Sequence, residues 1–276
     1  MQKKKYRLIV TDFDGTLLRD DQTVAEETVK TIHDYQASGG GFAVCTGRTP
    51  QSILPRLREL GIKGLVSTFQ GSVVLDAETG ELIQDGYMQQ SAAVAVCKTL
   101  EGLGLHIHVY ALDEYYSNEG GELLKMYEEI SGVKGIVSDI PLSKLILEKD
   151  LKVRKVNTII APEKREEVFN LLTECYGEEC NVTYSTAFMV EISSNEYSKG
   201  TALALLAERH GVTLADTLAV GDSLNDLPML AAAGLGLAVK NADERLQKAV
   251  KVYGYTNDEN AVGRIIEEYG VWGEGV

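Results

Sequence analysis

The chain has 276 residues, of which 44% are hydrophobic and 25% are charged. This composition is typical of a globular protein, and the length predicts one large domain or two, since a domain takes roughly 150 residues. The 41 acidic residues outnumber the 27 basic ones and give a net charge of -14. Such a charge excludes general affinity for nucleic acid or for anionic membranes, because both need basic surface. The net charge does not exclude a small anionic substrate, because such a substrate needs only a local positive field.

The sequence gives no indication of a membrane segment. The basic run at positions 3–5 is followed by too few apolar residues for a signal peptide before Asp12 interrupts them. No apolar run approaches the ~18 residues that span a bilayer. We therefore expect a soluble, cytoplasmic protein. We also expect it to be a monomer or a homodimer.

The cysteines and two of the histidines give only weak indications of a metal site. Cys175 and Cys180 lie in CYGEEC, which lacks the CxxC spacing and has no histidine nearby, so we interpret them as structural. His106 and His108 alternate in the strand-like LHIHVY. Two alternatives stay open for this pair, a strand on the surface, which we favour, and chelation of a metal.

The first part of the chain alternates strands and helices. Apolar runs predict strands at residues 7–10, 41–46 and 64–68. A helix is expected at about 24–38, with Thr23 as its N-cap and Gly39 as its stop. Another helix begins after Thr49, with Pro50 at its first position. This alternation predicts a parallel sheet that is covered by helices on both faces.

The pattern changes near residue 70 and returns near residue 198. Between these points we expect a hairpin at 72–83, helices at 91–103 and from 161, and strands at 105–110, 114–117, 155–160, 182–186 and 189–192. After them come a helix that begins at about Lys199, strands at 217–222 and 234–239, and a last helix at 260–269. The fold class is therefore α/β, with a doubly wound, Rossmann-like parallel core at 1–83 and 191–276 and an inserted α+β domain at 84–190.

Polar, glycine-containing loops follow three of the predicted core strands. They read TDFDGT, TGR and GDSLND, and they carry the carboxylates of Asp12, Asp14, Asp222 and Asp226. Ligands of open parallel sheets bind beyond the carboxyl ends of the strands, so these side chains are expected to converge there with Thr46. Several carboxylates in one crevice stay ionised only if a cation binds them, and all-oxygen ligation suits Mg²⁺.

A positive group is also needed for an anionic substrate. Lys199 follows Ser198, which is interpreted as an N-cap, so this lysine would begin a helix of the core and could hold a phosphate or a carboxylate. The alternative, a solvated helix residue, stays open from position alone. For GDSLND alone, a capped turn is also possible, with Asp222 as N-cap and Asp226 in the first turn.

The four segments DFDGTLL, TGR, SKG and GDSLND, in this order, resemble the four motifs of the haloacid dehalogenase-like hydrolase superfamily. The inserted domain lies between the second and third of them, as in members with a type IIB cap, and the combination resembles the Cof-type sugar-phosphate phosphatases. This resemblance covers nearly the whole chain, and the joint occurrence of the motifs is specific.

The resemblance implies a role for each matching residue. Asp12 would be the nucleophile that forms an aspartyl phosphate, and Asp14 would protonate the leaving oxygen and then activate water. Thr46 and Lys199 would hold the phosphoryl oxygens. Mg²⁺ would be bound by Asp12, by the backbone carbonyl of Asp14 and by Asp222, with Asp226 in a supporting position. Residues expected on the substrate side of the site are Gly47, Arg48, Asn225 and Asn241.

Two departures from the family pattern concern substrate contacts. Gln70 precedes Gly71 where many Cof-type members have asparagine, and Lys240 stands where a glycine is common. The function that the resemblance implies is Mg²⁺-dependent hydrolysis of small phosphorylated metabolites, sugar phosphates first among them. A phosphotransferase or phosphosugar mutase and a non-catalytic phosphate sensor on the same fold are the alternatives.

Overall fold

The computed structural model describes residues 4–186 and 188–273, which fold into two compact units. The first unit comprises residues 4–47, 54–84 and 197–273, and the second comprises 48–53 and 85–196, without residue 187. The domain limits expected at 83/84 and 190/191 differ slightly from this division. The limit expected at 190/191 falls inside strand β11 (Met189–Ser194).

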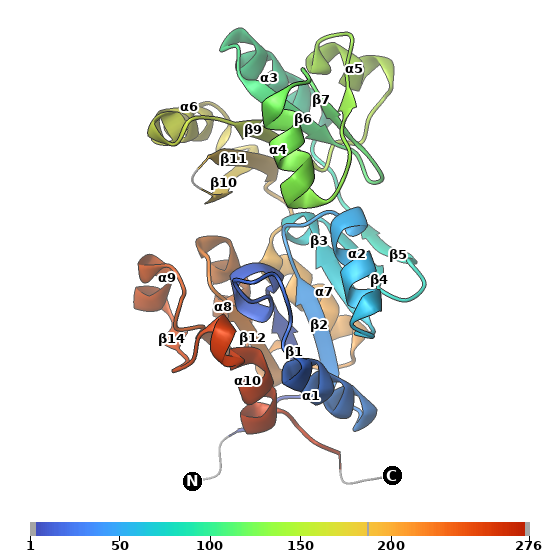
Figure 1. The fold of residues 1–276 in the computed structure, drawn as a ribbon, viewed down its shortest axis with the longest axis vertical. Coiled ribbons are helices and arrows are strands. Elements are labelled where there is room, and N and C mark those ends of the chain that lie inside the picture. Colours follow the sequence, from blue (N-terminus) through green and yellow to red (C-terminus); the bar gives the residue numbers. More distant parts are fainter. Residues whose placement is uncertain (1–3, 187, 274–276) are drawn as a thin grey trace. The chain divides into compact units, whose positions relative to one another are not determined.

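The first unit is built on an eight-stranded sheet with the order β14-β13-β12-β1-β2-β3-β4-β5 (Figure 1). Its strands are β1 (Leu8–Thr11), β2 (Gly41–Cys45), β3 (Leu65–Thr68), β4 (Val73–Asp76), β5 (Leu82–Asp85), β12 (Thr217–Gly221), β13 (Leu235–Ala238) and β14 (Lys251–Val252). The strands from β14 to β3 run parallel, and β4 is antiparallel to β3. This confirms the predicted α/β class with a mainly parallel core.

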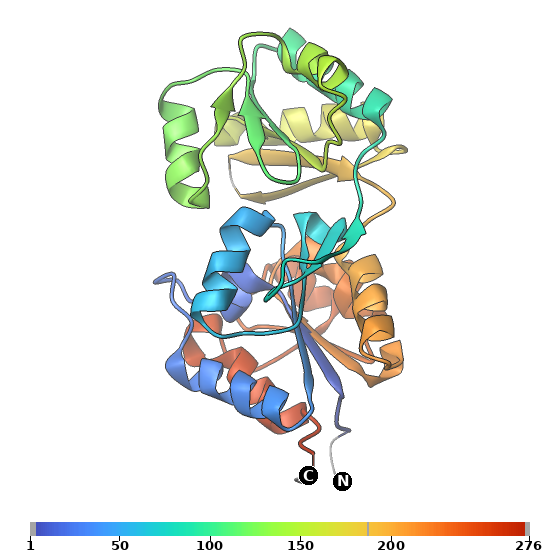
Figure 2. The ribbon, with the colours of Figure 1, turned by 90° about the vertical axis from the view of Figure 1, so that its right-hand side faces the viewer.

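Helices cover both faces of this sheet. They are α1 (Glu26–Ala37), α2 (Pro50–Glu59), α7 (Lys199–Arg209), α8 (Leu227–Ala232), α9 (Glu244–Ala249) and α10 (Ala261–Tyr269). Figure 2 shows α1 and α10 on one face and α7 on the other. Helix α1 begins later than predicted, because Ala25 is its N-cap residue and the Thr23 hydroxyl donates instead to Asp21 at 2.6 Å.

The register brings the carboxyl ends of three strands to one edge of the sheet. Thr11, the last residue of β1, lies opposite Val220 of β12 and Val44 of β2. The loops that follow these strands therefore start side by side, as was expected for TDFDGT, TGR and GDSLND.

The second unit contains a six-stranded sheet with the order β10-β11-β9-β6-β7-β8. Its strands are β6 (His106–Tyr110), β7 (Tyr115–Ser117), β8 (Ile136–Val137), β9 (Lys155–Ile159), β10 (Cys180–Thr186) and β11. Its helices are α3 (Gln90–Gly102), α4 (Glu122–Ser131), α5 (Leu142–Glu148) and α6 (Arg165–Tyr176). Side chains from α3, α5 and α6 form one apolar core with Ile107, Val109, Val156 and Ile192 of the sheet.

The opposite face of this sheet is polar but buried. His108 lies opposite Asn157, which lies opposite Glu191 on the next strand, and all three are at most 5% exposed. The prediction that His106 and His108 lie on a surface strand was therefore wrong, since β6 is an inner strand. Nε2 of His106 contacts Nε2 of His108 at 2.9 Å, and Nδ1 of His106 contacts Oε1 of Glu119 at 3.1 Å.

The described cysteines form no disulfide, and Cys175 is exposed while Cys180 is buried. None of the described helices has both the length and the apolar character needed to cross a membrane.

Candidate active site

The first acidic side chain of the site follows β1 directly. The Asp12 backbone N–H donates to the Val220 carbonyl at 2.9 Å, so β12 fixes this residue, and its side chain is buried. The strand does not extend to Asp14, because residues 13–17 form a turn in which the Leu18 N–H donates to the Phe13 carbonyl at 2.7 Å and Gly15 has φ +73°. Asp12 and Asp14 therefore belong to different elements, the end of the strand and the turn that follows it. Asp12 is buried at the sheet edge, and Asp14 is exposed in the turn.

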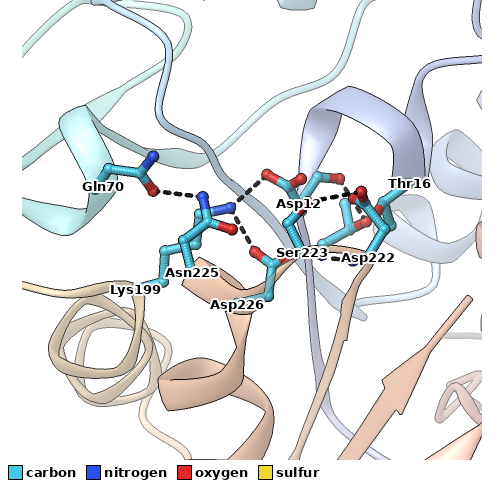
Figure 3. Close-up of polar contacts among 9 residues, drawn as sticks. Asp12, Thr16, Gln70, Lys199, Asp222, Ser223, Asn225 and Asp226 are labelled. Carbon is cyan, nitrogen blue, oxygen red and sulfur yellow. Dashed lines mark hydrogen bonds and ion pairs between the residues drawn. The ribbon is translucent and has the colours of Figure 1, made fainter. Parts of the chain in front are cut away.

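Lys199 lies at the start of α7 and points at the end of β1 (Figure 3). Ser198 caps this helix through a reciprocal pair of hydrogen bonds with Thr201, as the sequence predicted for the cap. The ammonium Nζ donates to Oδ1 of Asp12 at 2.6 Å and to Oδ1 of Asp226 at 2.5 Å. With 1% of its surface exposed, Lys199 is not the solvated helix residue that was the alternative.

Both carboxylate oxygens of Asp226 are engaged by the protein. Oδ1 accepts from Lys199, and Oδ2 accepts from the backbone N–H groups of Asp222 and Ser223, each at 2.9 Å. The side chain is fully buried. This arrangement makes Asp226 an anchor that fixes the lysine and the loop after β12. The N-cap of that loop's short helix is Ser223, whereas the capped-turn alternative placed Asp222 there.

Asp222 is oriented by two hydroxyl groups that the sequence did not single out. Thr16 donates to its Oδ1 at 2.7 Å and Ser223 donates to its Oδ2 at 3.0 Å. Gly15 is needed beside it, because a Cβ on Gly15 would lie 2.8 Å from Oδ2 of Asp222. The signal that could have found Thr16 is its place in the DGT turn, opposite a loop that carries an acid.

The electrostatics of the cluster call for a cation. Oxygen atoms of Asp12, Asp222 and Asp226 lie within 4.8 Å of one another. The ammonium group of Lys199 is bonded to Asp12 and Asp226 but not to Asp222. Burial raises the pKa of Asp12 well above its usual value, Lys199 opposes this rise, and the neighbouring carboxylates add to it. Burial and Asp226 also raise the pKa of Asp222. An all-oxygen set with excess negative charge fits a hard divalent cation.

Thr46 and Gly47 follow β2 and lie next to the turn after β3. The Thr46 backbone N–H donates to Ser67 at 2.9 Å, and its carbonyl accepts from the Gln70 N–H at 3.1 Å. Gly47 lies directly under Gln70, since a Cβ on Gly47 would be 2.4 Å from Nε2 of Gln70. In turn, Oε1 of Gln70 accepts from Nδ2 of Asn225 at 3.0 Å (Figure 3).

Comparison with known proteins agrees with this geometry. The family model described as haloacid dehalogenase-like hydrolase matches residues 9–266. The chain belongs to this hydrolase family. The match includes every residue of the acidic cluster together with Lys199, so the resemblance drawn from the motifs is confirmed.

Relatives of this hydrolase resemble it along nearly their whole length. Phosphatase YwpJ of Bacillus subtilis is 28% identical over 284 residues, which cover 95% of this chain and 99% of the relative. An HMP-PP phosphatase of Cronobacter sakazakii is 27% identical over 243 residues, with coverage of 87% and 86%.

Solved structures show the same architecture. A haloacid dehalogenase-like hydrolase from B. subtilis superposes with a TM-score of 0.84 at 28% identity, over 95% of this chain and 99% of the other. The subclass IIB sugar phosphatase BT4131 superposes with a TM-score of 0.80 at 19% identity, over 95% and 98%. At that identity the similarity concerns the fold, which is the expected α/β core with an inserted α+β cap.

Two residues that were predicted to contact the substrate, Asn241 and Arg48, form hydrogen bonds with other residues of the protein. Nδ2 of Asn241 donates to the Gly15 carbonyl at 2.8 Å and Oδ1 accepts from the Asn257 N–H at 2.9 Å, so its carboxamide holds the turn after β1. Arg48 belongs to the second compact unit, where its Nη1 donates to Ser52 at 3.2 Å. Contact of either residue with substrate stays a prediction. Lys240 is exposed.

Proposed function

We propose that this hydrolase is a Mg²⁺-dependent phosphatase that acts on small phosphorylated metabolites, sugar phosphates in particular, through an aspartyl phosphate on Asp12. The observation that carries this proposal is the buried ion pair of Lys199 with Asp12 and Asp226 at the end of β1. A phosphoryl group and an attacking carboxylate are both anionic, so their approach requires a fixed positive charge.

The chain's own groups suit two successive displacements. An oxygen of the Asp12 carboxylate attacks phosphorus while the bond to the leaving oxygen breaks, and Asp14 gives that oxygen a proton. Asp14 then takes a proton from water, whose oxygen attacks phosphorus and releases inorganic phosphate and the free Asp12 carboxylate. Asp14 is exposed and Asp12 is buried, and this difference suits one group that exchanges protons and one that does not.

The acidic cluster would hold the cation through Asp12, Asp222 and the Asp14 carbonyl. When bound, Mg²⁺ supplies positive charge that offsets the charge developing on the phosphoryl oxygens. Asp226 would position the other groups of the site and not bind the cation directly, because its oxygens already accept hydrogen bonds from Lys199 and from two backbone N–H groups.

The proposed substrate class comes from the resemblance to Cof-type phosphatases. One relative is an HMP-PP phosphatase, so the panel of candidate substrates is not restricted to sugar phosphates. A cytoplasmic location and a monomeric or homodimeric state also stay predictions.

The test is a screen for phosphate release over a panel of phosphorylated metabolites, with and without Mg²⁺. We expect stoichiometric inorganic phosphate from at least one sugar phosphate, dependence on Mg²⁺, and loss of turnover in Asp12→Asn. The matched control is Asp34→Asn, which changes an exposed aspartate of α1. An isomeric sugar phosphate formed without free phosphate would instead identify a mutase, and binding without turnover would identify a sensor.

A further inference from the structure

The turn between β3 and β4 has an unusual backbone. Phe69, Gln70 and Gly71 have φ values of +50°, +59° and +108°, so two side-chain-bearing residues in succession adopt the left-handed region. Such conformations cost about 1–3 kcal/mol each and persist where the surrounding structure imposes them. Here the Gln70 N–H bonds Thr46 at 3.1 Å and Phe69 is buried. The strained turn is therefore fixed against the loop that follows β2.

Gly71 brings this turn against the start of α7. A Cβ on Gly71 would lie 2.1 Å from the Ser198 carbonyl oxygen and 3.0 Å from the Lys199 nitrogen. No side chain is tolerated at that distance, so the turn and the peptide that carries Lys199 lie in direct contact. Gln70 precedes Gly71 in this turn, and its backbone is therefore fixed by the same contact with the start of α7.

The Gln70 side chain is held in one orientation. It is 6% exposed, it lies over Gly47, and its Oε1 accepts from Nδ2 of Asn225 at 3.0 Å (Figure 3). With Oε1 bound to Asn225, the carboxamide presents the two N–H groups of Nε2 at Gly47. Among the described residues, Oδ1 of Asn225 is buried and accepts no hydrogen bond.

This orientation differs from the role predicted for Asn225. Asn225 was predicted to contact the substrate, but its donor group bonds Gln70 in this structure. Of these two side-chain amides, it is Nε2 of Gln70 that lies against Gly47, after the end of β2. An amide N–H is a suitable partner for a phosphoryl oxygen, because it supplies a hydrogen bond to an anion without adding charge.

Resting on the proposed phosphatase function, we propose that Gln70 donates a hydrogen bond from Nε2 to the bound phosphoryl group and that Asn225 is the positioning residue that orients it. Gln70→Glu keeps the shape and the acceptor for Asn225 but removes both donors and adds a repelling charge. Gln70→Leu removes the hydrogen bond without adding charge. Asn225→Leu removes the orienting bond and leaves the Gln70 donors in place.

The experiment measures the affinity of the full-length protein for inorganic phosphate in the presence of Mg²⁺ by calorimetry, together with KM and kcat for a substrate from the panel. Losing a hydrogen bond to a charged group is expected to weaken phosphate binding roughly 10- to 100-fold in Gln70→Leu and further in Gln70→Glu. Asn225→Leu should weaken it less, and the double variant should bind no more weakly than Gln70→Leu alone, since Asn225 acts through Gln70.

The matched control is Gln84→Leu. Nε2 of Gln84 donates to the carbonyls of Gly71 and Ser72 at 2.9 and 3.2 Å, so this variant weakens the same turn without removing an amide beside Gly47. It should leave phosphate affinity unchanged. Equal loss in Gln84→Leu and Gln70→Leu, or unchanged affinity in Gln70→Glu, would overturn the inference.

The binding measurement also separates the two proposals. A wild-type protein that binds phosphate but hydrolyses nothing on the panel contradicts the phosphatase function, and the Gln70 variants still decide the role of the amide. A wild-type protein that hydrolyses substrates while Gln70→Glu keeps its phosphate affinity and KM contradicts only the role of Gln70. A wild type that binds no phosphate contradicts the role of Gln70 as well.

Discussion

Nζ of Lys199 lies 2.6 Å from Oδ1 of Asp12, although 187 positions separate the two residues in the chain. Both are buried, and their pairing joins the end of β1 to the start of α7. Burial alone would lower the pKa of Lys199, but Asp12 and Asp226 raise it above its ordinary value, so the ammonium group stays charged.

Removing this ammonium group should be costly for both stability and activity. Lys199→Met leaves Asp12 and Asp226 buried without their counter-ion, and breaking such a pair typically costs about 3–5 kcal/mol. We expect turnover to fall by roughly 10²–10³-fold or more, as for the loss of a fixed donor to a developing anion. Urea unfolding and steady-state kinetics measure the two effects. Lys248→Met, at an exposed position, is the control that should change neither.

Stabilisation by Mg²⁺ should increase with pH. The pKa of Asp222 is raised by burial and then by Asp226, so protons and cations compete for the cluster as the pH falls through that raised value. Thermal unfolding with and without Mg²⁺ at about pH 5 and about pH 8 should show the larger stabilisation at the higher pH, up to about 2.7 kcal/mol when the ion is at 100 times its Kd. Asp222→Asn should remove most of it. Equal stabilisation of both proteins would place the ion elsewhere.

Alanine substitutions at Gly71 and at Gly39 test whether the contact between the β3–β4 turn and α7 positions Lys199. Both have positive φ, +108° and +85°, but a Cβ on Gly39 meets nothing within 4 Å, whereas one on Gly71 meets the Ser198 carbonyl at 2.1 Å. Gly39→Ala should cost only the backbone penalty of about 1–2 kcal/mol and leave kcat unchanged. Gly71→Ala should cost more and should lower kcat, because it displaces the peptide of Lys199. Equal effects on kcat would show that this contact does not position the lysine.

The buried His108 should make the protein sensitive to acid. Burial, His106 and Lys155 lower the pKa of His108 to about 3, below its usual value near 6.5. The unfolded chain therefore binds a proton between these values while the folded one does not, and stability falls as the pH drops below about 6.5, by about 2 kcal/mol at pH 5. His108→Asn should flatten this dependence in urea titrations. His33→Asn, at an exposed position, should retain the wild-type slope.

The sequence predicted the acidic edge of the sheet because polar, glycine-containing loops follow apolar strands. That pattern is local, and it placed Asp12, Thr46 and Asp222 at neighbouring strand ends. The convergence of Lys199 depends on helix α7 lying against the sheet, which no local pattern specifies. The cap at Ser198 made Lys199 a candidate with a solvated residue as the alternative, and the family resemblance supplied its role.

The predictions that were wrong or missing involve tertiary context. His106 and His108 alternate as a surface strand would, but β6 lies between β9 and β7. Helix α4, whose Tyr127 ring lies 4.7 Å from that of His108, was not predicted. The orientation of Gln70 depends on positive φ values at residues that do not favour them, and so no turn rule would have predicted it.

The central claim is that Asp12 carries the phosphoryl group. The most direct measurement is peptide mass spectrometry of the Mg²⁺-loaded enzyme after rapid acid quench during turnover of a sugar phosphate identified by the screen. Our account predicts a phosphoryl group on the peptide that contains Asp12, and neither that modification nor turnover in Asp12→Asn. Full turnover by Asp12→Asn, or a phosphoryl group found on a different residue, would contradict it.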